Sequence, residues 1–366
     1  MNLGLTESLP SLVSRRFTAA KESGSLLFSA THLAILSSKR GIDYQLRYCP
    51  ALSKKPEKQS PQNKPPGPKP DPFENPSGDL LITDVSLCKE AEKSHNLILN
   101  KFPVIPNHFI LATKQFEKQT DLLEKEDLGI AYACLEAWEY PSPADGVDVK
   151  EEEKRKERRR RRRLFMFFNS GDESGASQPH RHVQFLPIED MRDQEEDSES
   201  EKRSASWIPL IDLLLTSADV QTSSSSGIRH LPNLPVQHFA MQIPRSESSP
   251  SPSVDKLHEI YLSLYHAALL ASTTSPSVTT EEQTRTSGAA AISYNLAMTR
   301  DIMMICPRRK ETATLSGLGA DSAADVSLNG TILAGTLMVK TEEQWDCLRG
   351  DGEVVNDLLA EVGIPI

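Results

Sequence analysis

The stretch "SGASQPHRHVQFLPI" (residues 174–188) joins a loop of small residues to two histidines and an apolar run. Along a β-strand, successive side chains point to opposite faces of the sheet. A strand that begins here therefore places His180, His182 and Gln184 on one face, with about 6.5 to 7 Å between successive members. Arg181 and Val183 then face the other side. One strand can thus line a site with polar groups while its reverse face enters a core.

Apolar runs on both sides of this strand predict the rest of the sheet. The runs "RLFMFFNSG" (163–171) and "GDLLITDV" (78–85) are typical of buried strands. Helical spacing instead marks "TDLLEKEDLGIAYACLEAWE" (120–139) and "KLHEIYLSLYHAALLAS" (256–272). Further strands are expected at 97–99, 109–111, 293–308 and 328–339. Residues 8–40, 342–350 and 353–363 are expected to form further helical segments. We therefore predict an α+β fold in which helices flank one face of an antiparallel sheet.

Two parts of the chain build this sheet. The N-terminal part, 1–245, carries the strand with the histidines, and the C-terminal part, 254–366, completes the sheet and the site. A weak echo links 96–114 with 294–311, because each reads strand, basic residue, strand, basic residue. The echo indicates that the fold consists of two related halves.

Two polar stretches are interpreted as loop insertions, at 154–163 and at 189–206. The first, "KRKERRRRRR", has nine positive charges in ten positions and would attract phosphate backbones. It follows an acidic run, and no interleaved aromatic residues accompany it. A solvated loop is therefore favoured over a nuclear signal or a weak RNA contact.

Composition and cysteine usage indicate the cellular compartment in which the protein is expected. The chain has a net charge of −10 and 38% hydrophobic residues, which indicates a folded core diluted by polar insertions. The five cysteines form no CxxC pair, so a disulfide framework is not expected and a reducing compartment is. The sequence contains no run of eighteen apolar residues, so no membrane span is expected. We expect a monomer in the cytoplasm, with a nuclear location left open by the arginine run.

The loop before the histidines is suited to an anion. Gly171 and Gly175 allow tight turns, and successive backbone N–H groups in such a loop can hold phosphate. A metal site would need a third ligand, and no Cys or further His lies nearby in sequence, so no metal ligand is assigned. A neutral imidazole can instead attack phosphorus and form a covalent intermediate. His182 is the candidate nucleophile, with the loop stabilising charge on the phosphate.

At these residues the chain resembles the transferase branch of the histidine-triad superfamily. "GASQPHRHVQ" is similar to its His-x-His-x-Gln signature, which galactose-1-phosphate uridylyltransferases share with fungal-type diadenosine tetraphosphate (Ap4A) phosphorylases, or ATP adenylyltransferases. "LNKFPVIPNHFILATKQF", "LPVQHF", "SYNLAMTRDIMMICPRRKE" and "AGTLMVKTEEQ" resemble the phosphorylases in family order. The resemblance covers most of residues 40–366 and favours the phosphorylase over the uridylyltransferase.

The resemblance implies a role for individual residues. His182 would carry AMP, and Gln184 would contact the phosphate of that intermediate. The remaining substrate-binding residues that it implies are Lys54, Asn100, Lys101, Asn169, Gly175, Ala176, Ser177, Gln178, Leu328, Asn329, Gly330, Thr336 and Lys340. His108 and His238 are interpreted as structural histidines.

The expected reaction is phosphorolysis of Ap4A to ATP and ADP in two steps through an adenylyl-histidine. The expected partners are the dinucleotide and inorganic phosphate. A divalent cation, expected to be Mg²⁺, would be bound through substrate oxygens rather than by a protein cage. Two alternatives stay open: a hexose-1-phosphate uridylyltransferase, and a non-catalytic nucleotide- or RNA-binding module.

Overall fold

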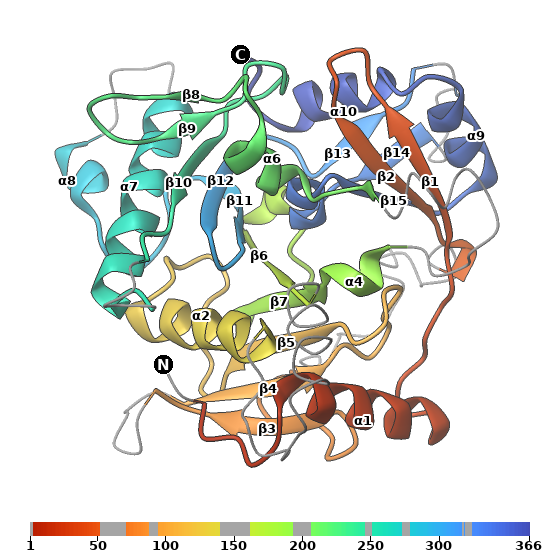
Figure 1. Ribbon diagram of the computed structural model, residues 1–366, viewed down its shortest axis with the longest axis vertical. Helices are drawn as coiled ribbons and strands as arrows, with labels where there is room; N and C mark the ends of the chain where they lie inside the picture. The colour runs from red at the N-terminus through yellow and green to blue at the C-terminus, as the bar shows by residue number, and fades with distance from the viewer. Residues whose placement is uncertain are drawn as a thin grey trace, which may run out of the picture.

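The computed structural model describes residues 3–51, 71–87, 94–139, 162–192, 206–245, 251–272, 279–316, 318 and 324–366. One large sheet forms its centre (Figure 1). Its strands are β3 (Leu81–Val85), β4 (His95–Leu99), β5 (Phe109–Thr113), β6 (Leu164–Ser170), β7 (His182–Pro187), β8 (Gln221–Thr222), β9 (Arg229–His230), β10 (Phe239–Gln242), β11 (Ser293–Met298) and β12 (Ile302–Arg308). They are ordered β3-β4-β5-β7-β6-β11-β12-β10-β9-β8. All their pairings are antiparallel, as predicted.

Each face of the sheet packs on its own core. Helices α1 (Leu9–Glu22), α2 (Lys125–Glu139) and α7 (Val254–Ser272) cover one face and bury side chains such as Met166, Phe168 and Val183. The opposite face buries Phe165, Phe167 and other strand residues. It packs against α4 (Ile188–Met191), α6 (Leu210–Thr216), the 3₁₀ helix η4 (Gly330–Ala334) and α10 (Val354–Val362). Because side chains alternate along β6, this one strand contributes residues to both cores.

Two halves with the same order of elements make up the sheet. β3, β4, β5, α2, β6 and β7 form one half, and β8, β9, β10, α7, β11 and β12 form the other. They join where β6 pairs with β11, for example at Phe168↔Leu296. The prediction of an α+β fold with two related halves is confirmed. The expectation that helices flank one face alone was wrong, because α4, α6 and α10 pack against the other face.

The echo that suggested the halves was wrong in its details. It equated β4 and β5 with β11 and β12, whereas strand order equates β4 and β5 with β9 and β10. Basic residues at strand ends carry no information about topology, so the match was coincidental. The predicted C-terminal part, 254–366, contributes β11 and β12 to the same sheet as the N-terminal part, and the boundary at 245–254 stays a prediction.

A smaller sheet stands beside the large one. It pairs β1 (His32–Ser37) with β2 (Asp43–Tyr48), and β2 in parallel with β15 (Thr336–Val339). The expectation of helix throughout 8–40 was therefore wrong beyond α1. Gly41, with φ of +77°, allows the tight turn of the β1–β2 hairpin. Residues 328–339 are likewise not all strand, because η4 precedes β15.

The remaining described elements lie around this framework. They are η2 (Asp172–Ser174), α8 (Thr280–Thr284), β13 (Thr312–Thr314), β14 (Asp325–Ser327) and α9 (Glu342–Gly350). Of the two predicted insertions, 189–206 begins inside α4, so 189–191 are helical rather than loop. Residues 193–205 and 154–161 lie outside the described residues. Within the described ranges no helix is long and apolar enough to cross a membrane. The four cysteines described, Cys49, Cys134, Cys306 and Cys347, are free.

Candidate active site

His182 is the first residue of β7, and its imidazole has a defined tautomer. Nδ1 lies 2.8 Å from the backbone oxygen of His180. A carbonyl can only accept, so Nδ1 carries the proton and Nε2 keeps its lone pair. Burial lowers the pKa of His182 from 6.5 to about 4. The ring is therefore neutral near pH 7, which is the form that can attack phosphorus.

His180 supports His182 rather than facing the substrate with it. Its ring is fully buried, with Nδ1 2.7 Å from Asp71 Oδ2 and Nε2 2.9 Å from Thr113 Oγ1. The Phe73 ring contacts both histidines, with centroids 4.8 Å from His182 and 5.9 Å from His180. Both ring nitrogens of His180 are thus engaged, and what it offers to the nucleophile is its backbone carbonyl.

The orientation of Gln184 follows from a chain of hydrogen bonds with one possible polarity. The Phe102 N–H donates to Asn100 Oδ1 at 2.9 Å, so the Asn100 amide nitrogen faces His108 Nδ1 at 3.0 Å. His108 must then carry its proton on Nε2, which lies 3.0 Å from Gln184 Oε1. The Gln184 oxygen is thereby turned to His108, and its NH₂ group is left to donate elsewhere.

His108 was interpreted as a structural histidine, yet it contacts a predicted phosphate ligand. Asn100 was expected to bind nucleotide, and its amide instead contacts His108 and the Phe102 backbone. Lys101 is exposed, with Nζ 5.6 Å from the Phe102 ring centroid. Lys101 lies in the turn between β4 and β5.

The glycine loop packs against the C-terminal part of the chain. Gly175 has φ of +78°, and a Cβ there would lie 2.9 Å from the Leu328 oxygen and from Asn329 Cβ. Only glycine fits this conformation and this close approach. The loop residues Gly175, Ala176 and Gln178 are half-buried and Ser177 is exposed. Gly175 therefore lies against Leu328 and Asn329, which are distant from it in sequence.

Asn169, at the end of β6, fastens that C-terminal segment. Its Oδ1 accepts from the Gly330 N–H at 2.8 Å and from the Asn295 amide at 2.9 Å. Asn329 caps η4 by accepting from the Thr331 N–H at 3.0 Å. The side-chain oxygens of Asn169 and Asn329 are thus used within the protein, although both residues were expected to bind nucleotide. Leu328 is buried, and its carbonyl accepts from Arg308 at 3.0 Å.

Thr336 and Lys340 follow η4, in β15 and just after it. Thr336 is buried in β15 and donates to Gln45 in the small sheet at 3.1 Å. Lys340 is exposed just after β15, and its N–H donates to Gln344 at 3.0 Å. Lys54 lies outside the described residues. Roles in binding for these residues stay predictions.

Several residues that the sequence did not single out hold the site together. They are Asp71, Phe73, Thr113, Gln119, Asn295 and Arg308. Each is distant in sequence from the residue that it contacts. The one local signal was the Asn and His of "LNKFPVIPNHF", which bracket a turn and therefore come close in a hairpin.

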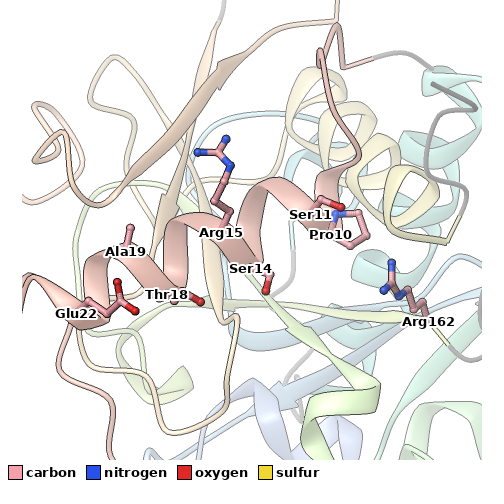
Figure 2. Close-up of a pocket in the computed structure, with 8 residues that line it drawn as sticks. All are labelled: Pro10, Ser11, Ser14, Arg15, Thr18, Ala19, Glu22 and Arg162. Atoms are coloured by element: carbon pink, nitrogen blue, oxygen red, sulfur yellow. The ribbon is translucent and has the colours of Figure 1, made fainter. Parts of the chain in front are cut away.

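A separate hollow of about 590 Å³ runs along α1, and Figure 2 shows that its walls are mostly hydroxyl and charged side chains. Arg162, at the end of the arginine run, faces α1 across it (Figure 2). The next residue, Arg163, is half-buried and pairs with the buried Asp212 at 2.6 Å. No predicted site residue lines this hollow, so the candidate active site remains the face of β7.

A neutral histidine with an unprotonated Nε2, beside a glycine loop on a two-half antiparallel sheet, is an arrangement suited to a nucleotidyltransferase, because such a ring can attack phosphorus. Sequence comparison supplies the particular family. The sequence model for the Ap4A phosphorylase N-terminal domain matches residues 3–140 and 160–198, and that for the ATP adenylyltransferase C-terminal domain matches 232–365. The chain belongs to this family of Ap4A phosphorylases, or ATP adenylyltransferases. The predicted family and enzyme class are confirmed.

Yeast relatives span the whole chain. Protein APA1 of Saccharomyces cerevisiae is 26% identical over 367 residues, covering 99% of this chain and 96% of the relative. Diadenosine 5',5'''-P1,P4-tetraphosphate phosphorylase 2 of the same yeast is 27% identical over 365 residues, with the same coverage. The crystal structure of yeast Ap4A phosphorylase Apa2 matches with a TM-score of 0.72 at 24% identity, over 99% of each chain. That likeness confirms the fold.

Proposed function

We propose that the protein phosphorolyses Ap4A with inorganic phosphate to ATP and ADP, using His182 as the nucleophile. The observation that carries this proposal is the His182 tautomer. Its Nδ1–H is bound to the His180 carbonyl at 2.8 Å, which leaves Nε2 unprotonated. Membership of the Ap4A phosphorylase family and crystal structures of yeast Apa2 in complex with Ap4A and with AMP support the choice of substrate.

In the first step, His182 Nε2 attacks the α-phosphorus of one adenosine. A P–N bond forms, the bond from that phosphorus to the bridging oxygen breaks, and ATP leaves. The ring becomes positively charged, and the His180 carbonyl at Nδ1 stabilises that charge. In the second step, an oxygen of inorganic phosphate attacks the same phosphorus, the P–N bond breaks, and ADP leaves with a neutral histidine restored.

The groups around His182 would hold the oxygens of the transferred phosphorus. The Gln184 NH₂ group is oriented by His108 and is a donor at any pH. The backbone N–H groups of the glycine loop, with Ser177, would add further donors. Donors that are fixed before the reaction stabilise developing charge without reorganisation.

A divalent cation would be bound through the substrate. Among the described residues, no group of three or more His, Cys, Asp or Glu side chains gathers in a way that could hold a metal. Mg²⁺ commonly keeps several waters and binds to substrate phosphates. Such an ion would reduce the negative charge of the tetraphosphate when bound. We further propose that the protein acts as a monomer in the cytoplasm.

Intact-mass analysis tests the proposed reaction. Brief exposure to Ap4A without phosphate should add the mass of one AMP to the protein, and adding phosphate should remove it as ADP. His182→Ala should acquire no adduct. Turnover of UDP-glucose with galactose 1-phosphate, but not of Ap4A with phosphate, would instead identify a uridylyltransferase. RNA binding without any cleavage would identify a binding module.

A further inference from the structure

We infer that Gln119 is a positioning residue for nucleotidyl transfer, because its amide replaces the missing β-ladder between His182 and the end of β6. This inference rests on the proposed function, in which His182 is the nucleophile. Gln119 lies in the segment between β5 and α2, far in sequence from β6 and β7. Its side chain is almost completely buried, with 2% exposure.

The strands β6 and β7 separate where the site begins. They pair from Leu164↔Pro187 to Phe167↔Gln184. Continuing that register would set Asn169 opposite His182, but the ladder stops before this point. Backbone groups that leave a ladder inside a protein need other partners.

The Gln119 amide provides those partners. Its Oε1 accepts from the His182 N–H at 2.7 Å. Its Nε2 donates to the Asn169 carbonyl at 2.8 Å and to the His182 carbonyl at 3.2 Å. One side chain thus binds both backbone groups of the nucleophile and bridges to the neighbouring strand.

Gln119 is itself held by the chain that precedes His182. Its N–H donates to the Pro179 carbonyl at 2.8 Å, and the Glu117 carbonyl accepts from the Arg181 N–H at 2.8 Å. Residues 117–119 therefore run beside 179–181. Arg181 is buried on the face that α1, α2 and α7 cover, 3.1 Å from Asp127 of α2. The amide is consequently anchored from both sides rather than free to rotate.

The bridge joins the two parts of the site. Asn169 uses its carbonyl for Gln119 and its side chain for the Gly330 N–H. The residues around Gly330 pack against the loop expected to bind phosphate. Gln119 therefore sets the distance between His182 and the elements that would hold the nucleotide. The Gln119 amide bonds to the backbone of His182 and Asn169, so it acts through His182 and not on the substrate.

The variant Gln119→Met keeps the length of the side chain and removes all three bonds. We expect the maximal rate of AMP adduct formation to fall roughly 10- to 100-fold, as expected for a misplaced nucleophile. The Ap4A concentration for half-maximal rate should change less than about threefold. Gln119→Asn keeps an amide but is one methylene shorter, so the rate of AMP adduct formation should also fall. This variant replaces Gln119→Met in the test if that protein folds poorly.

Asn356→Leu is the matched control, because it removes a buried amide of α10 that bonds Tyr44 and Glu353 away from β7. It should lower the melting temperature while leaving the adduct rate within about twofold of the unmutated protein. Gln119 variants that are destabilised but react at the unmutated rate would overturn the inference. A weakened Ap4A half-saturation with an unchanged maximal rate would overturn it as well. If the unmutated protein forms no AMP adduct, the proposed function fails instead.

Discussion

His182 should remain an active nucleophile at a pH where an ordinary histidine is protonated. The attack needs a neutral ring, because a proton on Nε2 removes the lone pair. Burial is the main cause that lowers the pKa of His182 from 6.5 to about 4. At pH 5.5, a histidine with a pKa of 6.5 is neutral in about a tenth of the molecules, whereas one with a pKa near 4 is neutral in nearly all of them. We therefore expect the rate of adduct formation to be nearly level from pH 7 to pH 5.5.

Rapid quenching followed by intact-mass analysis measures this rate at saturating Ap4A without phosphate. All phosphates of Ap4A are internal, so the charge of the tetraphosphate stays constant over this range. Phe73→Ala removes the ring whose centroid lies 4.8 Å from that of His182. Water would then reach the imidazole and weaken the desolvation that lowers its pKa. The acid limb of the variant should move to higher pH.

The control is Phe116→Ala, which removes a ring whose centroid lies 5.4 Å from that of His180. It should leave the position of the acid limb unchanged. A fall of about eightfold in the rate of the unmutated protein between pH 7 and pH 5.5 would refute the reasoning, since it would mean that the nucleophile titrates as an ordinary histidine. An acid limb that does not move in Phe73→Ala would show that this ring is not what desolvates His182.

Gly330→Ala would place a Cβ 2.8 Å from Asn169 Oδ1, so we expect the free energy of unfolding in urea to fall by about 1–3 kcal/mol; an unchanged midpoint would contradict this. His108→Leu should slow adduct formation roughly tenfold and His108→Gln much less, and the effect of the leucine should vanish in a Gln184→Ala background, whereas additive effects would contradict the orienting role. Burial lowers the pKa of His238 to about 4, so the folded state binds fewer protons than the unfolded state below pH 6.5. Stability should therefore be full above pH 6.5 and fall towards pH 4 by up to roughly 3 kcal/mol, less steeply in His238→Gln; identical pH profiles of urea unfolding would contradict it.

The pattern along the chain was enough to predict the face of β7 that forms the site. Alternation placed His182 and Gln184 on the same face, and Val183 packs in the core beneath α1, α2 and α7. The buried runs around it predicted the antiparallel sheet. These features are local, because side-chain direction in a strand depends only on the parity of the position.

Local pattern failed where long-range pairing decides the structure. Residues 32–37 contain closely spaced apolar residues that fit a helix, but pairing with β2 makes them a strand. The echo between 96–114 and 294–311 failed for a similar reason, since strand order is set by packing of the two halves. Short apolar segments carry little preference of their own, and tertiary context overrides it.

The sequence by itself determined which groups make up the candidate site: the histidine proposed as the nucleophile, the glutamine proposed as a donor and a glycine loop, all in one stretch. Only the tertiary structure decided the tautomer of His182, the orientation of Gln184 through His108, and the bridge made by Gln119. The physical reason is that hydrogen-bond polarity and desolvation depend on groups that the fold brings from distant segments, and spacing along the chain does not encode which of those groups will meet.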